Sequence, residues 1–181
     1  MIYLNSDDIW VAFHKGYKDG DNKRIITSTT IKLFTWSKYS HVELIFPEWV
    51  TAPDDNPRWF SSRGMDEPRG VSFKDISMSH PDRWDCYKLT YIRTPGEVQE
   101  IYNVAKSLVG QGYDLRGVLS YFGPGSRIRR RRNRRNASDD LWWCSEAVAF
   151  VLSFNDFRVC PGELDKMIRD RIKKNKQITT L

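Results

Sequence analysis

The sequence predicts an α+β domain, and two patterns along the chain support this. Short segments within residues 9–91 alternate apolar and polar side chains, as half-buried strands do. After residue 95 the apolar side chains recur at helical spacing instead. Strands followed by helices are typical of an antiparallel sheet that packs on helices. The 181 residues show no internal repeat and no dividing linker, so we expect residues 1–181 to form one domain.

The first half of the chain is predicted to be mostly strand. The predicted strands cover residues 9–13, 40–46, 58–62, 70–73 and 82–91. Residues 25–36 have a start rich in threonine and serine that could open a helix, although threonine also favours strands.

One predicted strand carries the first chemically informative pair. Successive strand residues point to opposite faces, so His41 and Glu43 share one face. Val42, Leu44 and Phe46 form the other face, which is apolar and which we expect to pack on the core.

The second half is predicted to be helical. A helix begins at Pro95, since proline is favoured in the first turn. Its apolar stripe consists of Val98, Ile101, Tyr102, Ala105, Leu108 and Val109. Gly110 and Gly112 end this helix, and a last, basic helix begins around Pro161.

Residues 141–152 are predicted to form an amphipathic helix with Cys144 in or near its first turn. The residues just upstream are types that cap helices: Ser138, Asp139 and Asp140. At a helix start the dipole and the unpaired amides favour an anion, so a thiol there ionises more readily to the nucleophilic thiolate. Neither Cys86, in an alternating strand, nor Cys160, beside Pro161, has an evident helix N-terminus.

Among the three histidines, His41 has the best context for a catalytic base. His14 precedes a charged loop, His80 lies in a Ser-His-Pro turn, and only His41 shares a strand face with a carboxylate. An imidazole beside a thiolate holds and returns the proton while a third polar group fixes its tautomer. Glu43 or a group from a neighbouring strand could be that third group. The backbone N–H of Cys144 is a natural oxyanion donor.

Four patches of the sequence are informative together: YSHVELIF, GQGYDLRGVLSYF, WWCSEAVAFVL and CPGEL. They resemble the circularly permuted NlpC/P60 branch of the papain-like cysteine hydrolases, the YiiX/YaeF-like proteins. In that branch the strand histidine precedes the nucleophilic cysteine, which reverses the order in papain. The resemblance extends over roughly residues 9–165. It implies a permuted papain-like fold with the histidine on a strand and the cysteine at a helix N-terminus.

The resemblance also implies roles for individual residues. It makes Cys144 the nucleophile and His41 the base. Glu43 is a less direct match for the third catalytic group, because that position is often small or apolar in the family. Tyr113 resembles an aromatic residue near the family's cleft and is expected to contact the substrate or the oxyanion. No metal or cofactor is implied.

The basic charge is concentrated in one segment that these motifs do not contain. Residues 127–135 hold seven arginines, more than the net charge of +6, so the rest of the chain is close to neutral. We expect this segment to lie in a loop insertion at residues 124–138. It is either a solvated loop, a site for nucleic acid or another polyanion, or a contact with anionic lipid head groups or the cell wall. The polyanion interpretation would use Arg129, Arg130, Arg131 and Arg132.

The sequence thus predicts a thiol-dependent hydrolase, such as an amidase or peptidase, or an acyltransferase, acting through an acyl-enzyme. The resemblance implies peptide, amide or lipid-acyl substrates. The alternative is a catalytically silent papain-like scaffold that binds a polyanion or a partner protein through the arginine-rich segment. The N-terminus has no secretory signal, no apolar run approaches the roughly 20 residues of a membrane span, and the odd number of cysteines favours a reducing compartment. We therefore expect a cytoplasmic protein of a bacterium or phage, or one that acts in a host cytoplasm.

Overall fold

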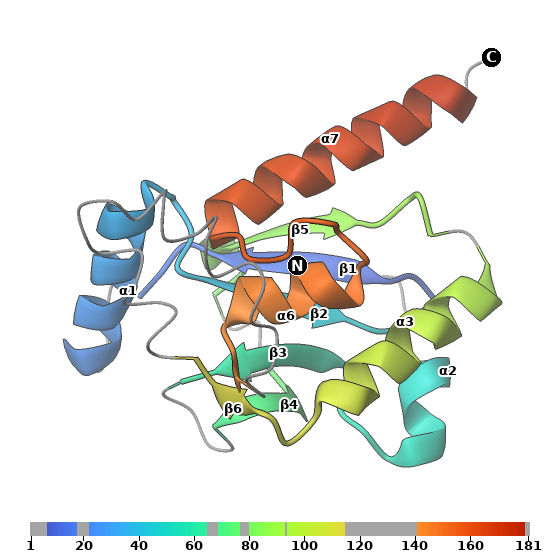
Figure 1. Ribbon diagram of the computed structural model, residues 1–181, viewed down its shortest axis with the longest axis horizontal. Helices are drawn as coiled ribbons and strands as arrows, with labels where there is room; N and C mark the ends of the chain where they lie inside the picture. The colour runs from blue at the N-terminus through green and yellow to red at the C-terminus, as the bar shows by residue number, and fades with distance from the viewer. Residues whose placement is uncertain are drawn as a thin grey trace.

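The computed structural model describes residues 7–17, 22–64, 69–76, 80–92, 94–114 and 141–179. These residues form an α+β fold with a five-stranded antiparallel sheet and five α-helices (Figure 1). At this level the predicted fold class is confirmed. The predicted insertion at residues 124–138 lies outside the described residues. Within the described ranges, no helix is both long and apolar enough to cross a membrane.

The main sheet contains all five predicted strands, with ends that differ by a few residues. They are β1 (Trp10–His14), β2 (His41–Ile45), β3 (Trp59–Arg63), β4 (Gly70–Lys74) and β5 (Trp84–Lys88). The strand order is β4-β3-β2-β1-β5, and each neighbouring pair is antiparallel. The central strand β2 is paired on both edges, which fixes its register.

The helices are α1 (Asn22–Thr35), α2 (Glu48–Thr51), α3 (Pro95–Leu108), α6 (Cys144–Val151) and α7 (Pro161–Thr179). The segment at residues 25–36 that the sequence left open is helical and belongs to α1. α3 begins at Pro95 as predicted, where Thr94 and Glu97 form a capping box. The prediction that Val109 belongs to the apolar stripe is wrong: α3 ends one residue earlier, and Val109 is 47% exposed.

A small parallel pair of strands, β6 (Gly112–Tyr113) and β7 (Leu141–Trp142), lies beside β4. The amide of Val71 donates to the Gln111 carbonyl at 2.8 Å. Gly70 makes this approach possible, since it adopts a φ of +89° and a Cβ there would lie 2.2 Å from the Gln111 oxygen. The end of α3 and the strand after it are thereby joined to the main sheet.

The main core lies between the sheet and α6, which crosses the front of the sheet in Figure 1 and packs against β2 and β3. Val42, Leu44 and Phe46 belong to this core, as predicted. The opposite face of β2 is not open either, because Ile45 lies in a smaller apolar cluster with Ala12 and Trp59. The residues on the His41 face of β2 are therefore largely enclosed.

The helix predicted over residues 141–152 is shorter than expected. Residues 141–142 form β7, and α6 begins at Cys144. The helix is not amphipathic: of its residues only Phe150 is exposed, because the sheet, α3 and α7 surround it. Its hydrophobic residues therefore indicate a core helix rather than one face of a surface helix.

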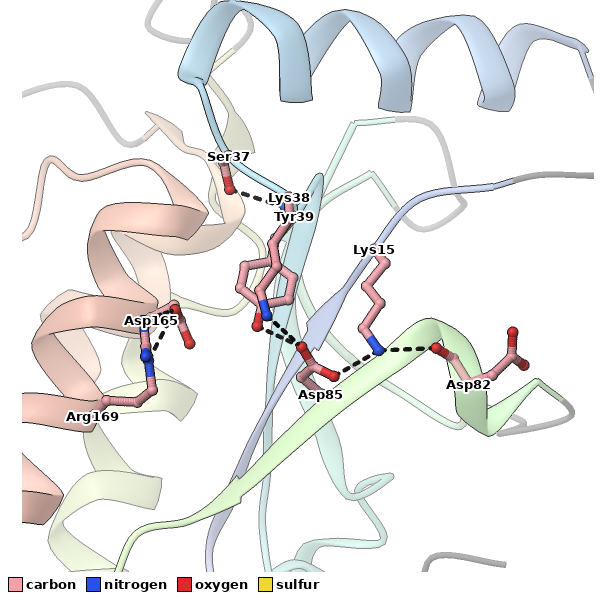
Figure 2. Close-up of polar contacts among 8 residues, drawn as sticks. All are labelled: Lys15, Ser37, Lys38, Tyr39, Asp82, Asp85, Asp165 and Arg169. Atoms are coloured by element: carbon pink, nitrogen blue, oxygen red, sulfur yellow. Dashed lines mark hydrogen bonds and ion pairs between the residues drawn. The ribbon is translucent and has the colours of Figure 1, made fainter.

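Asp85 on β5 ties this strand to the segments that leave β1 and enter β2 (Figure 2). Its carboxylate accepts a hydrogen bond from the Tyr39 hydroxyl at 2.6 Å and pairs with Lys15 at 2.6 Å and Lys38 at 2.9 Å. Burial alone would raise the pKa of Asp85, but the hydrogen bonds from these three groups lower it to about 2. Because Tyr39 precedes His41 by two residues, this cluster fixes the place where β2 begins.

Replacing Asp85 with asparagine should lower the free energy of unfolding by about 1 to 2 kcal/mol at about pH 7, since charge-assisted hydrogen bonds are lost. The folded-state pKa of Asp85 lies below the ordinary value, so its stabilisation is present above about pH 4 and is lost as the pH falls through about 2. Urea unfolding of Asp85→Asn and the parent protein at both ends of this range measures the effect. An equal destabilisation at both pH values would contradict it.

Candidate active site

Cys144 is the first residue of α6 and is 6% exposed. Its two neighbours in the chain bind the segment that precedes α7. Ser145 Oγ donates to the Val159 carbonyl oxygen at 2.5 Å, and Trp143 Nε1 donates to the same oxygen at 3.1 Å. One carbonyl group thus holds both flanking residues, which fixes the sulfur at the start of the helix.

α6 is capped from within the helix rather than from upstream. The residues predicted to cap it, Ser138, Asp139 and Asp140, lie outside the described residues, and β7 separates them from the helix. The N-cap residue is Trp143, whose side chain makes no capping hydrogen bond. Glu146 instead accepts from the Trp143 backbone N–H and pairs with Arg158 at 3.0 Å. Burial raises the pKa of Glu146 to about 7, although Arg158 acts in the opposite direction.

His41, the first residue of β2, lies close enough to Cys144, across the end of the sheet, for the two side chains to interact electrostatically. Its side chain is 26% exposed, so the imidazole reaches solvent. Burial alone would lower the pKa of His41, but the negative charges of Cys144 and Glu43 and their hydrogen bonds outweigh it and raise the pKa above the ordinary value. A raised pKa keeps the His41 imidazole protonated at neutral pH, so it can donate a proton.

Glu43 holds the other side of the imidazole ring. His41 Nε2 donates to Glu43 Oε1 at 2.7 Å. Glu43 is 1% exposed, and the guanidinium of Arg63, itself 3% exposed, compensates its charge. Arg63 Nη2 lies 2.5 Å from Oε2, and Nε lies 3.2 Å from Oε1. Nη1 donates to the backbone and side-chain oxygens of Ser72 at 3.1 Å each, so every nitrogen of the guanidinium is hydrogen-bonded.

Arg63 is the residue of this site that the sequence analysis missed. It lies on β3 beside His41, in a strand whose alternate members Trp59 and Ser61 are also buried. An arginine that alternates with buried strand positions indicates a buried charge, and a buried charge needs a partner of opposite sign. That partner cannot be chosen before the strand order and the register are known.

His14 lies opposite His41 in the β1–β2 register. It is 5% exposed and packs on the rings of Tyr17 and Trp84, with centroid separations of 4.7 Å in both cases. Burial, together with the charges of His41 and Arg83, lowers the pKa of His14 to about 4. His14 is therefore neutral at neutral pH, whereas His41, its neighbour across the β1–β2 pair, is positively charged.

Tyr113 on β6 lies close enough to Cys144 for the two side chains to interact electrostatically. Burial, and then the negative charges of Cys144 and Asp114, raise the pKa of Tyr113 above its ordinary value, so the phenol stays protonated and can donate. Gly64, at the end of β3, lets the ring approach, because a Cβ there would lie 2.7 Å from a ring carbon. The structure thus places Tyr113 near Cys144, and its expected contact with the substrate or the oxyanion stays a prediction.

A small pocket of about 30 Å³, open to solvent, lies beside the sulfur. It is lined by Ile31, Thr35, Ser40, Tyr113, Trp143, Cys144, Ser145, Cys160 and Pro161. Apart from the Cys144 sulfur, none of these side chains carries a charge. The lining residues come from α1, from β6 and from the starts of α6 and α7.

The prediction that Cys160 lacks a helix N-terminus is wrong. It directly precedes α7, and its amide donates to Glu163 Oε2 at 2.8 Å, so it does lie at a helix N-terminus. Burial nevertheless raises the pKa of the Cys160 thiol to about 11, and the Cys86 thiol is raised to about 11 for the same reason. No histidine is among the groups that shift the pKa of either thiol, so Cys144 remains the candidate nucleophile.

Comparisons with protein-family models, with curated proteins and with solved structures found no match. Among the described residues, no group of three or more histidine, cysteine, aspartate or glutamate side chains is placed to hold a metal ion. The residues predicted to bind a polyanion, Arg129, Arg130, Arg131 and Arg132, lie outside the described ranges.

We expect iodoacetamide to alkylate Cys144 first at about pH 6, faster than Cys86 and Cys160 by about tenfold or more, because only a thiolate reacts. Peptide mapping after brief labelling measures the three rates. In His41→Ala the advantage of Cys144 should largely disappear, since the cation that stabilises the thiolate is removed. Equal labelling of all three cysteines in the parent protein would count against an activated Cys144.

Replacing Arg63 with methionine should lower the free energy of unfolding by about 3 to 5 kcal/mol, because the Glu43 carboxylate stays buried without a compensating charge. Urea unfolding measures this loss. The double variant Glu43→Gln, Arg63→Met should recover part of it, since no uncompensated charge remains. A loss below about 1 kcal/mol in the single variant would show that the pair is not buried as described.

Proposed function

We propose that the protein is a thiol hydrolase or acyltransferase that forms an acyl-enzyme on Cys144. The observation that carries this proposal is the series from Cys144 to His41 to Glu43, in which His41 interacts electrostatically with Cys144 and is hydrogen-bonded to Glu43, with the sulfur at the start of a helix. A nucleophile, a base and a group that orients the base are the parts that acyl transfer needs.

We further propose that the fold is a permuted papain-like fold of the NlpC/P60 type. The order of the chain supports this, because the histidine on β2 precedes the cysteine at the start of α6. The packing supports it too, because the cysteine helix lies on an antiparallel sheet. The orienting group lies on the histidine's own strand, two residues later, and Arg63 from β3 supports it.

In the first half of the reaction the Cys144 sulfur attacks the carbonyl carbon of an ester or amide. A carbon–sulfur bond forms while the carbonyl π electrons move to the oxygen. As the tetrahedral intermediate collapses, the bond to the alcohol or amine breaks, and the His41 imidazolium donates its proton to that leaving group. The now neutral His41 then takes a proton from water or another acceptor, which attacks the thioester and releases Cys144.

Two donors lie near the place where the carbonyl oxygen becomes negative. One is the backbone N–H of Cys144 at the helix start, where the helix dipole also favours an anion. The other is the Tyr113 hydroxyl, which stays protonated because its pKa is raised. Donors held in place by packed elements need no reorganisation as the charge develops.

The pocket beside the sulfur favours an uncharged acyl group. A charged substrate group would lose its hydration there without gaining a partner, because none of the lining side chains other than Cys144 is charged. The alternative of a silent scaffold relied on residues 127–135, which lie outside the described residues, so no structural observation favours it.

Hydrolysis of p-nitrophenyl butyrate, an ester with a short uncharged acyl group, tests the proposal. Cys144→Ala should lower kcat/KM by about 10³-fold or more, and His41→Ala by a comparable factor, because the two residues act as one unit. Cys86→Ser is the matched control and should retain activity, since Cys86 packs in the apolar cluster with Ala12 and Trp59 and is not among the residues that line the pocket beside Cys144. Activity that survives in Cys144→Ala, with melting temperature unchanged, would refute the acyl-enzyme.

A further inference from the structure

Helix α1 carries a row of apolar side chains that face solvent. Ile26 is 65% exposed, Leu33 is 68% exposed, and Trp36, directly after the helix, is 96% exposed. The first two are seven residues apart, which is two helical turns, so they lie on the same side of the helix. We call these three side chains the α1 apolar stripe. An exposed row of large apolar side chains on one element marks an interaction site.

The stripe faces away from the body of the protein. Ile31 and Thr35 on the same helix line the pocket beside Cys144, and Ser28 is buried. At 3.6 residues per turn, these positions lie roughly opposite the stripe. Figure 1 shows α1 at the side of the molecule rather than on a face of the sheet. One side of α1 therefore lines the pocket, and the other side faces solvent.

Trp36 is held in a conformation that does not favour its side chain. The Ser37 amide donates to the Lys32 carbonyl at 3.1 Å, the bond of a Schellman motif, and this places Trp36 at the left-handed position with a φ of +51°. Glycine is the residue that fits there best. A tryptophan at this position is strained, and at 96% exposure it recovers almost nothing through packing within the chain.

The charge on α1 identifies what the stripe would meet. The helix contains Lys23, Arg24 and Lys32 and no aspartate or glutamate. Lys38, two residues after Trp36, is 63% exposed at its side chain but pairs with Asp85, so it adds no net charge beside the stripe. Basic residues beside an apolar row that ends in tryptophan are the pattern of a helix lying in a lipid interface, with the indole ring at the level of the head groups.

We propose that α1 docks on an anionic lipid surface through Ile26, Leu33 and Trp36. The apolar side chains enter the boundary between head groups and acyl chains, while the basic residues pair with the negative head groups. The stripe is short, so binding needs both contributions and is reversible. This proposal does not depend on the proposed hydrolase activity, because it uses the opposite side of α1 from the pocket.

Co-sedimentation of the full chain with vesicles tests the docking surface. The protein should bind vesicles of phosphatidylcholine mixed with phosphatidylglycerol and bind pure phosphatidylcholine much less. The triple variant Ile26→Ser, Leu33→Ser, Trp36→Ser should reduce binding to the anionic vesicles by about tenfold or more. The matched control Trp49→Ser, Val109→Ser removes apolar side chains that are 41% and 47% exposed, one on α2 and one directly after α3, and it should bind as the parent does.

A second variant separates docking from folding. Trp36→Gly relieves the left-handed strain, so its melting temperature should equal or exceed that of the parent while its vesicle binding falls. A merely structural role for Trp36 would lower the melting temperature instead, and would overturn the proposal.

Three further outcomes would also overturn it. Equal binding by the parent and the triple variant would mean that another basic segment, such as residues 127–135, holds the vesicles. Equal binding to neutral and anionic vesicles would remove the role of charge. A concentration-dependent dimer in light scattering without lipid, abolished in the triple variant, would show that a second copy of the chain covers the stripe.

Discussion

A single buried carboxylate sets the geometry of the proposed active site. Glu43 accepts from His41 on one side and from Arg63 on the other, so neither of its oxygens is left without a partner. Rotation of the carboxylate would leave a buried charge uncompensated, which costs several kcal/mol. The imidazole therefore has one favoured orientation, with Nε2 on the carboxylate. The surrounding strands maintain this orientation, because Arg63 is fixed on the strand next to β2.

The sulfur is placed independently, by the contacts at the start of α6. Val159 holds the residues on both sides of Cys144, and Glu146 caps the helix from inside while paired with Arg158. Two rigid elements, each fixed by its own buried polar contacts, thus meet at their ends. Preorganisation of this kind is what acyl transfer requires, since reacting groups that are already oriented lose little entropy in the transition state.

Local pattern alone predicted the parts of the fold that depend on neighbouring residues. The alternation in β2 placed His41 and Glu43 on one face, and helical spacing gave α3 from Pro95. Local pattern failed where the structure of a segment depends on contacts with distant parts of the chain. Arg63 was missed because its partner depends on strand register, and the upstream caps were wrong because β7 pairs with β6 and ends the extended chain just before Cys144. Cys160 was misjudged because the start of α7 depends on tertiary contacts.

The parallel pairing of β6 and β7 has a consequence for the wall of the pocket. The Asp114 amide donates to the Trp142 carbonyl at 3.1 Å, so positions 114 and 142, far apart in the sequence, are held side by side. Tyr113 and Trp143, each next to one of these positions, both line the pocket. Two neighbouring parts of the pocket wall therefore come from distant parts of the chain, and the short ladder between β6 and β7 keeps them in register.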